Sequence, residues 1–216
     1  MVNKTVRSPP VPIPKVPPVM KGYVTIDGDI GSGKSTVMRY IAAKYGLPIH
    51  LEPVETWETY LDAMYNGLQK PTPFEFQVRI WLDQCFPKLK CIIERSPFFT
   101  QSTFVNLMRE RSMISYSEYG ILNELYALAI KAWTPTVYIY LRSNPDNCYN
   151  RMILRSRDCE KRLDLNYMKD LHKLHQSAFM YATMMGVPVM AVDVENRTVE
   201  DIGDEVYRIM KHFQVI

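Results

Sequence analysis

A glycine-rich segment directly after an apolar run constrains the fold of this chain more than any other feature. Residues 28–35 read GDIGSGKS and match the pattern G-x-x-x-x-G-K-[ST], and the apolar run 23–26 before them is typical of a buried strand. Glycines let backbone N–H groups curl around phosphate oxygens at the start of the helix that follows. The motif therefore predicts a strand, a phosphate-binding loop and a helix, with a nucleoside triphosphate as ligand.

Within this loop we expect the Lys34 ammonium to bridge the β- and γ-phosphates and the Ser35 hydroxyl to bind Mg²⁺. Kinases, GTPases and other ATPases share such a loop, so other motifs must separate them. The N-K-x-D motif of GTPases is missing, because the one Asn-Lys pair, at residues 3–4, is followed by Thr-Val. The predicted nucleotide contacts in the loop are Gly28, Asp29, Ile30, Gly31, Ser32, Gly33, Lys34, Ser35 and Thr36.

Short apolar runs alternate with longer helical stretches from residue 22 onward. The runs 23–26, 48–53, 91–94, 136–141 and 187–194 are typical of strands that are buried on both faces. This alternation predicts an α/β fold of the P-loop NTPase type, a three-layer sandwich with a five-stranded parallel sheet and a lid. The length suits one domain, over 22–216, and the interval 55–89 should hold two helices.

The N-terminal segment 1–21 differs in composition from the rest of the chain. It holds six of the fifteen prolines and is predicted to be a disordered tail. The segment also explains the formal net charge of +3, since four basic residues and no acidic ones precede Asp27. The remainder is nearly balanced, with 22 basic and 23 acidic residues, which argues against nucleic acid as a partner.

Other features of the sequence bear on the compartment. No apolar run reaches the ~18 residues that a membrane span needs, and no secretory signal pattern is present. The four cysteines form no C-x-x-C pair, so we expect reduced thiols and no zinc site. The expectation is a cytoplasmic protein with no membrane partner.

Charged residues follow the second and third predicted strands. The carboxyl ends of parallel strands face the ligand crevice, so Glu52 should reach the γ-phosphate region, where a general base for an alcohol belongs. Glu94 and Arg95 end the next strand and are expected to serve Mg²⁺ and the phosphoryl charge. Either Glu94 or Asp193 could be the acid of a Walker-B strand; for Asp193 we favour a loop position near the adenine.

A group of basic residues and a pair of histidines also bear on the function. Five basic residues lie within 151–162, and in a chain whose charge is otherwise balanced they predict a lid that closes over phosphates, with Arg155 and Arg157 in it. His172 and His175 are three residues apart on a predicted helix, with no third metal ligand in the pattern, so we interpret them as surface histidines.

Three short sequences behind the loop, in this order, resemble the deoxyribonucleoside kinase family over about residues 20–215. They are Glu52-Pro53-Val54 with Trp57, Glu94-Arg95-Ser96, and Arg155-Ser156-Arg157 with Glu160. The resemblance implies transfer of the γ-phosphoryl group of ATP to the 5′-hydroxyl of a deoxyribonucleoside, with Mg²⁺, in a homodimer.

The resemblance also implies roles that the residues alone do not. It makes Glu52 the base for the 5′-hydroxyl and Arg95 the group that holds this hydroxyl, and it places the sugar 3′-hydroxyl between Tyr65 and Glu160. The residues implied to surround the nucleobase are Trp57, Gln77 and Phe104.

The chain departs from the family pattern at two places. Cys159 precedes Glu160 where relatives often have two adjacent acids. Gln84 and Thr100 stand at positions that help separate base preferences in the family, and this pair matches neither preference, so the preferred base stays open.

Two alternatives to a deoxynucleoside kinase remain. A nucleoside monophosphate kinase would need basic side chains near Trp57 and Gln77 for the 5′-phosphate of the acceptor, and Arg79 is the candidate. A non-kinase P-loop ATPase, such as a nucleic-acid motor, would use Asp193 as its Walker-B acid.

Overall fold

The computed structural model describes residues 19–66, 71–85 and 89–216. The predicted disorder of residues 1–18 lies outside this part of the chain. Met20 is buried in the core, and the Lys21 amide donates a hydrogen bond to the Val215 carbonyl at 2.8 Å. Among the described residues, packing against the core therefore already includes Met20, two residues before the expected start of the domain at Gly22.

A parallel five-stranded sheet forms the centre of the molecule, as the alternation predicted. Its strand order is β2-β3-β1-β4-β5. The edge strand β2 is shorter than the predicted run 48–53, since proline lacks an N–H and the flanking Pro48 and Pro53 cannot donate to a ladder. The strands are β1 (Val24–Gly28), β2 (Ile49–His50), β3 (Ile92–Glu94), β4 (Val137–Arg142) and β5 (Val189–Asp193).

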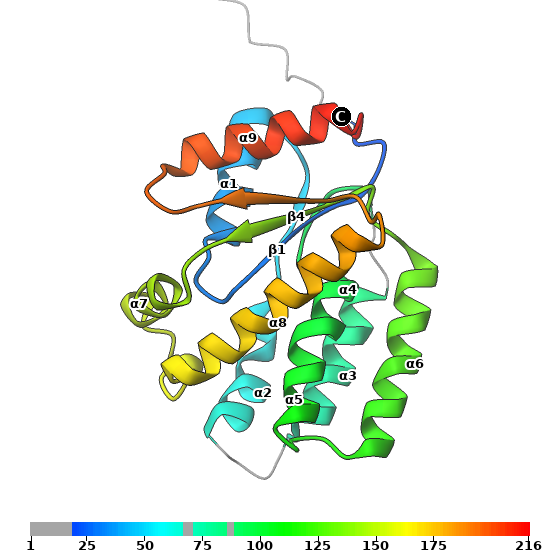
Figure 1. Ribbon diagram of the computed structural model, residues 1–216, viewed down its shortest axis with the longest axis vertical. Helices are drawn as coiled ribbons and strands as arrows, with labels where there is room; N and C mark the ends of the chain where they lie inside the picture. Colours follow the sequence, from blue (N-terminus) through cyan, green and yellow to red (C-terminus); the bar gives the residue numbers. More distant parts are fainter. Residues whose placement is uncertain (1–18, 67–70, 86–88) are drawn as a thin grey trace, which may run out of the picture.

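Helices cover both faces of the sheet and complete three layers (Figure 1). α1 (Lys34–Tyr45) and α9 (Val199–His212) lie on one face, and α4 (Pro97–Thr100) and α8 (Leu165–Met184) lie on the other. Side chains alternate along β4. Ile139 joins the core with α1 and α9, whereas Tyr140 packs beside Phe99 of α4 and Ala178 of α8.

The interval between β2 and β3 holds the two predicted helices, α2 (Val54–Asn66) and α3 (Pro73–Gln84). A capping box starts α6 (Tyr116–Ala132), where the Ser115 side chain accepts from the Glu118 amide, and Asn144 caps α7 (Pro145–Arg155). A π-helix (Gln101–Val105), α5 (Asn106–Glu110) and a 3₁₀ helix (Asp158–Glu160) complete the elements of the described residues. None of these helices has the length and apolar character that crossing a membrane requires.

Candidate active site

A cavity of about 520 Å³ opens beyond the carboxyl ends of the strands. It gathers residues that are far apart in the sequence, from the loop after β1 to the 3₁₀ helix after α7. Four predicted site residues do not line it: Gly28, Asp29, Ser32 and Asp193. Those that do are Ile30, Gly31, Gly33, Lys34, Ser35, Thr36, Glu52, Trp57, Tyr65, Gln77, Glu94, Arg95, Phe104, Arg155, Arg157 and Glu160.

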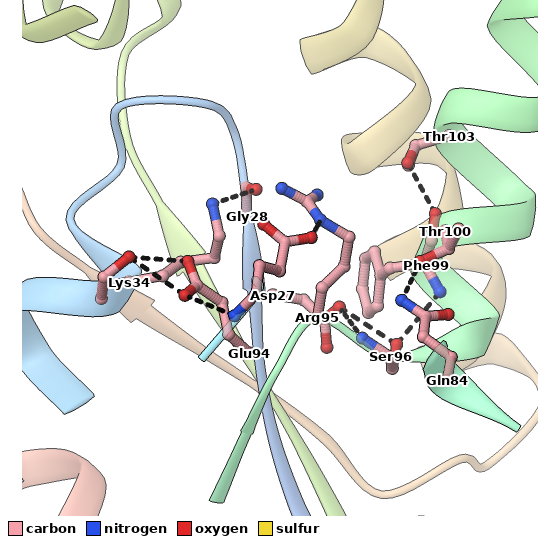
Figure 2. Close-up of polar contacts among 12 residues, drawn as sticks. Asp27, Gly28, Lys34, Gln84, Glu94, Arg95, Ser96, Phe99, Thr100 and Thr103 are labelled. Atoms are coloured by element: carbon pink, nitrogen blue, oxygen red, sulfur yellow. Dashed lines mark hydrogen bonds and ion pairs between the residues drawn. The ribbon is translucent and has the colours of Figure 1, made fainter. Parts of the chain in front are cut away.

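The loop after β1 curls around the ammonium group of Lys34. The Lys34 Nζ donates to the Gly28 carbonyl at 3.1 Å (Figure 2) and to the Asp29 carbonyl at 2.9 Å. Burial, together with the charge of Arg95, lowers the pKa of Lys34. A methyl group on Gly31 would lie 2.3 Å from the Cys148 carbonyl oxygen, so the loop sits directly against α7.

Ser35 and Glu94 place oxygen ligands side by side next to Lys34. The Ser35 hydroxyl donates to both carboxylate oxygens of Glu94, at 2.8 and 3.0 Å, and Glu94 is buried. The described residues form no group of three or more acidic, histidine or cysteine side chains that could hold a metal alone. Mg²⁺ usually takes one or two protein oxygens, with phosphate and water completing its shell, so this pair fits it.

Glu52 and Arg95 form a partly buried ion pair beyond the ends of neighbouring strands. The Arg95 Nε donates to the Glu52 Oε1 at 2.7 Å, and the two side chains are 7% and 15% exposed. Burial opposes the charge of Arg95, but Glu52 outweighs it and the pKa of Arg95 is raised. The backbone of Arg95 has a φ of 68°, a strained value for a residue with a side chain, of the kind found at functional sites. Its guanidinium lies 4.3 Å from the centre of the Phe104 ring.

The far end of the cavity is mostly aromatic. Gln77 is 1% exposed, and among the described residues neither its amide nitrogen nor its amide oxygen has a hydrogen-bond partner. Trp57 is fixed by a hydrogen bond of 2.9 Å from its Nε1 to Asp83. A buried amide without partners is costly, so Gln77 is a side chain that a ligand with polar edges would satisfy.

Tyr65 and Glu160 also line the cavity, and Glu160 ends the 3₁₀ helix within the predicted lid segment. Glu160 accepts from the Arg155 Nη2 at 2.7 Å through both of its oxygens, and the Arg157 Nη1 is 3.5 Å from it. Burial raises the pKa of Tyr65, whose ring packs edge-on against Tyr167. The lid arginines thus converge on one buried carboxylate at the rim of the cavity.

The interpretation of His172 and His175 as surface histidines is wrong. His175 is fully buried, and both side chains contact the Asp29 carboxylate of the phosphate-binding loop. Their spacing of three placed them on one face of a helix and so could have signalled a shared partner. That partner lies about 140 residues earlier in the chain, and no sequence pattern connects the two segments.

Asp193 ends β5, which pairs with β4 at the edge of the sheet. Its carboxylate is bound by Arg142, at 2.5 Å to the Nε and 2.7 Å to the Nη2, and it is exposed. The acid beside the Ser35 hydroxyl is instead Glu94, so Glu94 has the position that the Walker-B interpretation requires, while its role in binding metal stays a prediction. A place for Asp193 near the adenine stays a prediction.

Comparisons with known proteins agree with this geometry. The model of the family described as deoxynucleoside kinase matches residues 24–216. A protein named as a kinase, 029R of Invertebrate iridescent virus 3, is 28% identical over 193 residues, covering 87% of this chain and 95% of the relative. Mitochondrial thymidine kinase 2 of Homo sapiens is 25% identical over 193 residues, covering 82% of this chain and 72% of the relative.

A solved structure shares the fold. Deoxyadenosine kinase from M. mycoides with bound dCTP superimposes with a TM-score of 0.76 at 24% identity, covering 88% of this chain and 99% of the other. The family match spans the whole sheet, the phosphate-binding loop and the cavity. The chain therefore belongs to the deoxynucleoside kinase family and is an enzyme that phosphorylates deoxynucleosides.

Proposed function

We propose that this enzyme transfers the γ-phosphoryl group of ATP to the 5′-hydroxyl of a deoxyribonucleoside, with Glu52 as the general base. One observation carries the proposal: the partly buried Glu52–Arg95 ion pair shares a single cavity with Lys34, Ser35 and Glu94 of the phosphate site. A carboxylate beside a phosphate-binding loop can accept the proton of a hydroxyl that attacks phosphorus.

Residues that line the cavity can account for each bond and proton of the reaction. The O–H bond of the 5′-hydroxyl breaks and its proton passes to the Glu52 carboxylate. The oxygen forms a bond to the γ-phosphorus, the bond to the bridging β,γ-oxygen breaks, and ADP leaves. Arg95 holds Oε1 of Glu52 and so orients the base, while its guanidinium lies within the cavity to attract the negative oxygens.

Ser35 and Glu94 are the residues that would hold Mg²⁺, which neutralises charge on the phosphate oxygens when bound. Lys34 already lies at the mouth of the loop, and Arg155 and Arg157 can approach from the lid. These cations stabilise the charge of the moving phosphoryl group, and a closed lid keeps water from competing with the hydroxyl.

The nucleoside would occupy the aromatic end of the cavity. The unpartnered amide of Gln77 supports a hydrogen-bonded base edge at this place, with Trp57 and Phe104 against the base faces. Tyr65 and Glu160 would take the sugar 3′-hydroxyl. The Gln84 amide donates to the Thr100 hydroxyl at 3.1 Å (Figure 2), and the pair does not decide between pyrimidine and purine.

The Glu52→Gln variant tests the proposal, assayed with MgATP and each of the four deoxynucleosides. We expect kcat to fall about 100-fold or more with every acceptor, because the amide cannot take a proton. Glu58→Gln is the matched control on α2, since Glu58 is exposed and does not line the cavity. Activity of Glu52→Gln within a few fold of the parent would exclude Glu52 as the base.

Thymidylate as a fifth acceptor tests the monophosphate kinase alternative. Its candidate cation, Arg79, is bonded to Asp83 at 2.9 Å and lines no part of the cavity. We therefore expect product from a nucleoside and none from thymidylate. Product from thymidylate alone would reverse this assignment.

A further inference from the structure

The phosphate-binding loop carries an acid whose side chain points away from the cavity. Asp29 is the second residue of the loop, and its side chain is 1% exposed. Its Oδ2 lies 2.6 Å from the Nδ1 of His172, and its Oδ1 lies 3.0 Å from the Nδ1 of His175. His172 of α8 thus holds the loop carboxylate by a hydrogen bond, and His175 of the same helix lies within 3.0 Å of its other oxygen.

The two histidines differ in how firmly they are held. His175 is fully buried, its Nδ1 also lies 3.0 Å from the Leu171 carbonyl, and its ring stacks on Phe99 and Tyr140 with centroids 6.0 and 6.2 Å apart. His172 is 19% exposed and can be replaced with less disturbance of the core. Burial raises the pKa of Asp29, but the charge of His175 and the hydrogen bond from His172 outweigh it and hold that pKa well below its usual range.

The backbone of the same residue supports the lysine of the loop. The Asp29 carbonyl accepts from the Lys34 Nζ, and two residues later Gly31 touches the Cys148 carbonyl of α7. The loop is therefore fixed between α7 and α8, the two helices that flank residues 156–164, which include Arg157 and Glu160 of the predicted lid.

The contact of Asp29 with α8 can keep the loop in place when Lys34 binds a phosphate. Lys34 must leave the Gly28 and Asp29 carbonyls to reach a phosphate, while the N–H groups of the loop must stay where phosphate oxygens can meet them. A loop held only by Lys34 would lose its support at that moment. The contact of the Asp29 side chain with α8 does not involve Lys34, so movement of the lysine does not require it to break.

We propose that His172 and His175 are positioning residues for phosphate binding: through the Asp29 side chain they fix the loop against α8, so that nucleotide meets a preformed site. The inference rests on the proposed use of ATP as donor. It predicts that damage to this contact weakens the nucleotide site and spares the nucleoside site. His172 contacts Asp29 of the phosphate-binding loop, whereas the residues proposed to hold the base lie on α2, α3 and the π-helix.

Steady-state kinetics of His172→Ala test this proposal. One series varies ATP at saturating deoxynucleoside, and the other varies the deoxynucleoside at saturating ATP. We expect the KM for ATP to rise about 10-fold or more, as for loss of a hydrogen bond to a charged group, and the KM for the deoxynucleoside to stay within about 2-fold. His172→Asn should recover most of the loss, because its amide N–H lies close to where Nδ1 was. His212→Ala, an exposed histidine on α9, is the matched control.

A double-mutant cycle with Asp29→Asn identifies the partner. His172→Ala should add less than about 2-fold to the KM for ATP when Asp29 is already replaced. Equal increases in both KM values, a lower Tm with unchanged KM for ATP, or full additivity in the cycle would each overturn the proposal. Calorimetric titration with ATP separates it from the proposed function: wild-type binding without any nucleoside product would refute the function, and weaker ATP binding by His172→Ala would still support the positioning role.

Discussion

Two glycines of the phosphate-binding loop allow the close packing of the loop on α7 to be measured. Gly31 and Gly33 both have positive φ, 81° and 93°, so an alanine at either position meets the same backbone strain, about 1–2 kcal/mol. Their surroundings differ. A Cβ on Gly31 would lie 2.3 Å from the Cys148 carbonyl oxygen, whereas a Cβ on Gly33 meets nothing within 4 Å.

The clash at Gly31 involves backbone, which cannot rotate away as a side chain can. Overpacking of this kind costs about 1–3 kcal/mol, so Gly31→Ala should lose about 2–5 kcal/mol of unfolding free energy against about 1–2 kcal/mol for Gly33→Ala. Urea unfolding followed by circular dichroism measures both, and equal m-values would show that the unfolded states are comparable. Losses that agree within about 0.5 kcal/mol would refute the argued contact between the loop and α7.

Two further predictions concern the metal site and the buried thiols. Ser35→Ala should raise the Mg²⁺ concentration for half-maximal activity and lower kcat/KM about 10- to 100-fold, whereas Ser35→Thr keeps a hydroxyl; an unchanged Mg²⁺ titration of the alanine variant would remove Ser35 from the metal site. Burial raises the pKa of Cys91 and Cys148 from 9.0 to about 11, so their contribution to stability is complete below pH 9 and is lost as the pH rises from 9 to 11. The free energy of unfolding from urea titrations should fall between pH 8 and pH 10.5 in the parent protein. In a variant with alanine at both positions this fall should be smaller by about 1–2 kcal/mol for each thiol removed. Equal falls in the two proteins would contradict this prediction.

How much the sequence could predict depends on how far each contact reaches. The loop, Glu52, Glu94 and Arg95 follow from local patterns, because a strand that is recognised in sequence also fixes which residue stands at its carboxyl end. The ion pair between Glu52 and Arg95 needed one more rule, that the ends of neighbouring parallel strands meet.

Other features depend on packing that no local pattern encodes. The burial of His175 arises from its stacking on Phe99 of α4 and Tyr140 of β4, and these residues meet only in the folded chain. In the sequence, nothing distinguishes Gln77 from other polar residues of a helix. Only its burial without partners distinguishes it as a group that a ligand would satisfy.

The internal partners of the site's cations determine what a phosphate must displace. Lys34 is bonded to neutral carbonyls, whereas Arg95 and Arg155 are bonded to carboxylates, Glu52 and Glu160. When a phosphate takes the place of a carbonyl as the partner of a cation, the new hydrogen bond joins two charged groups and is stronger than the one it replaces. When it takes the place of a carboxylate, one ion pair replaces another, and the carboxylate is left buried without its partner. We therefore expect a triphosphate to recruit Lys34 most easily and Arg95 to stay with Glu52, where it would orient the proposed base throughout the transfer.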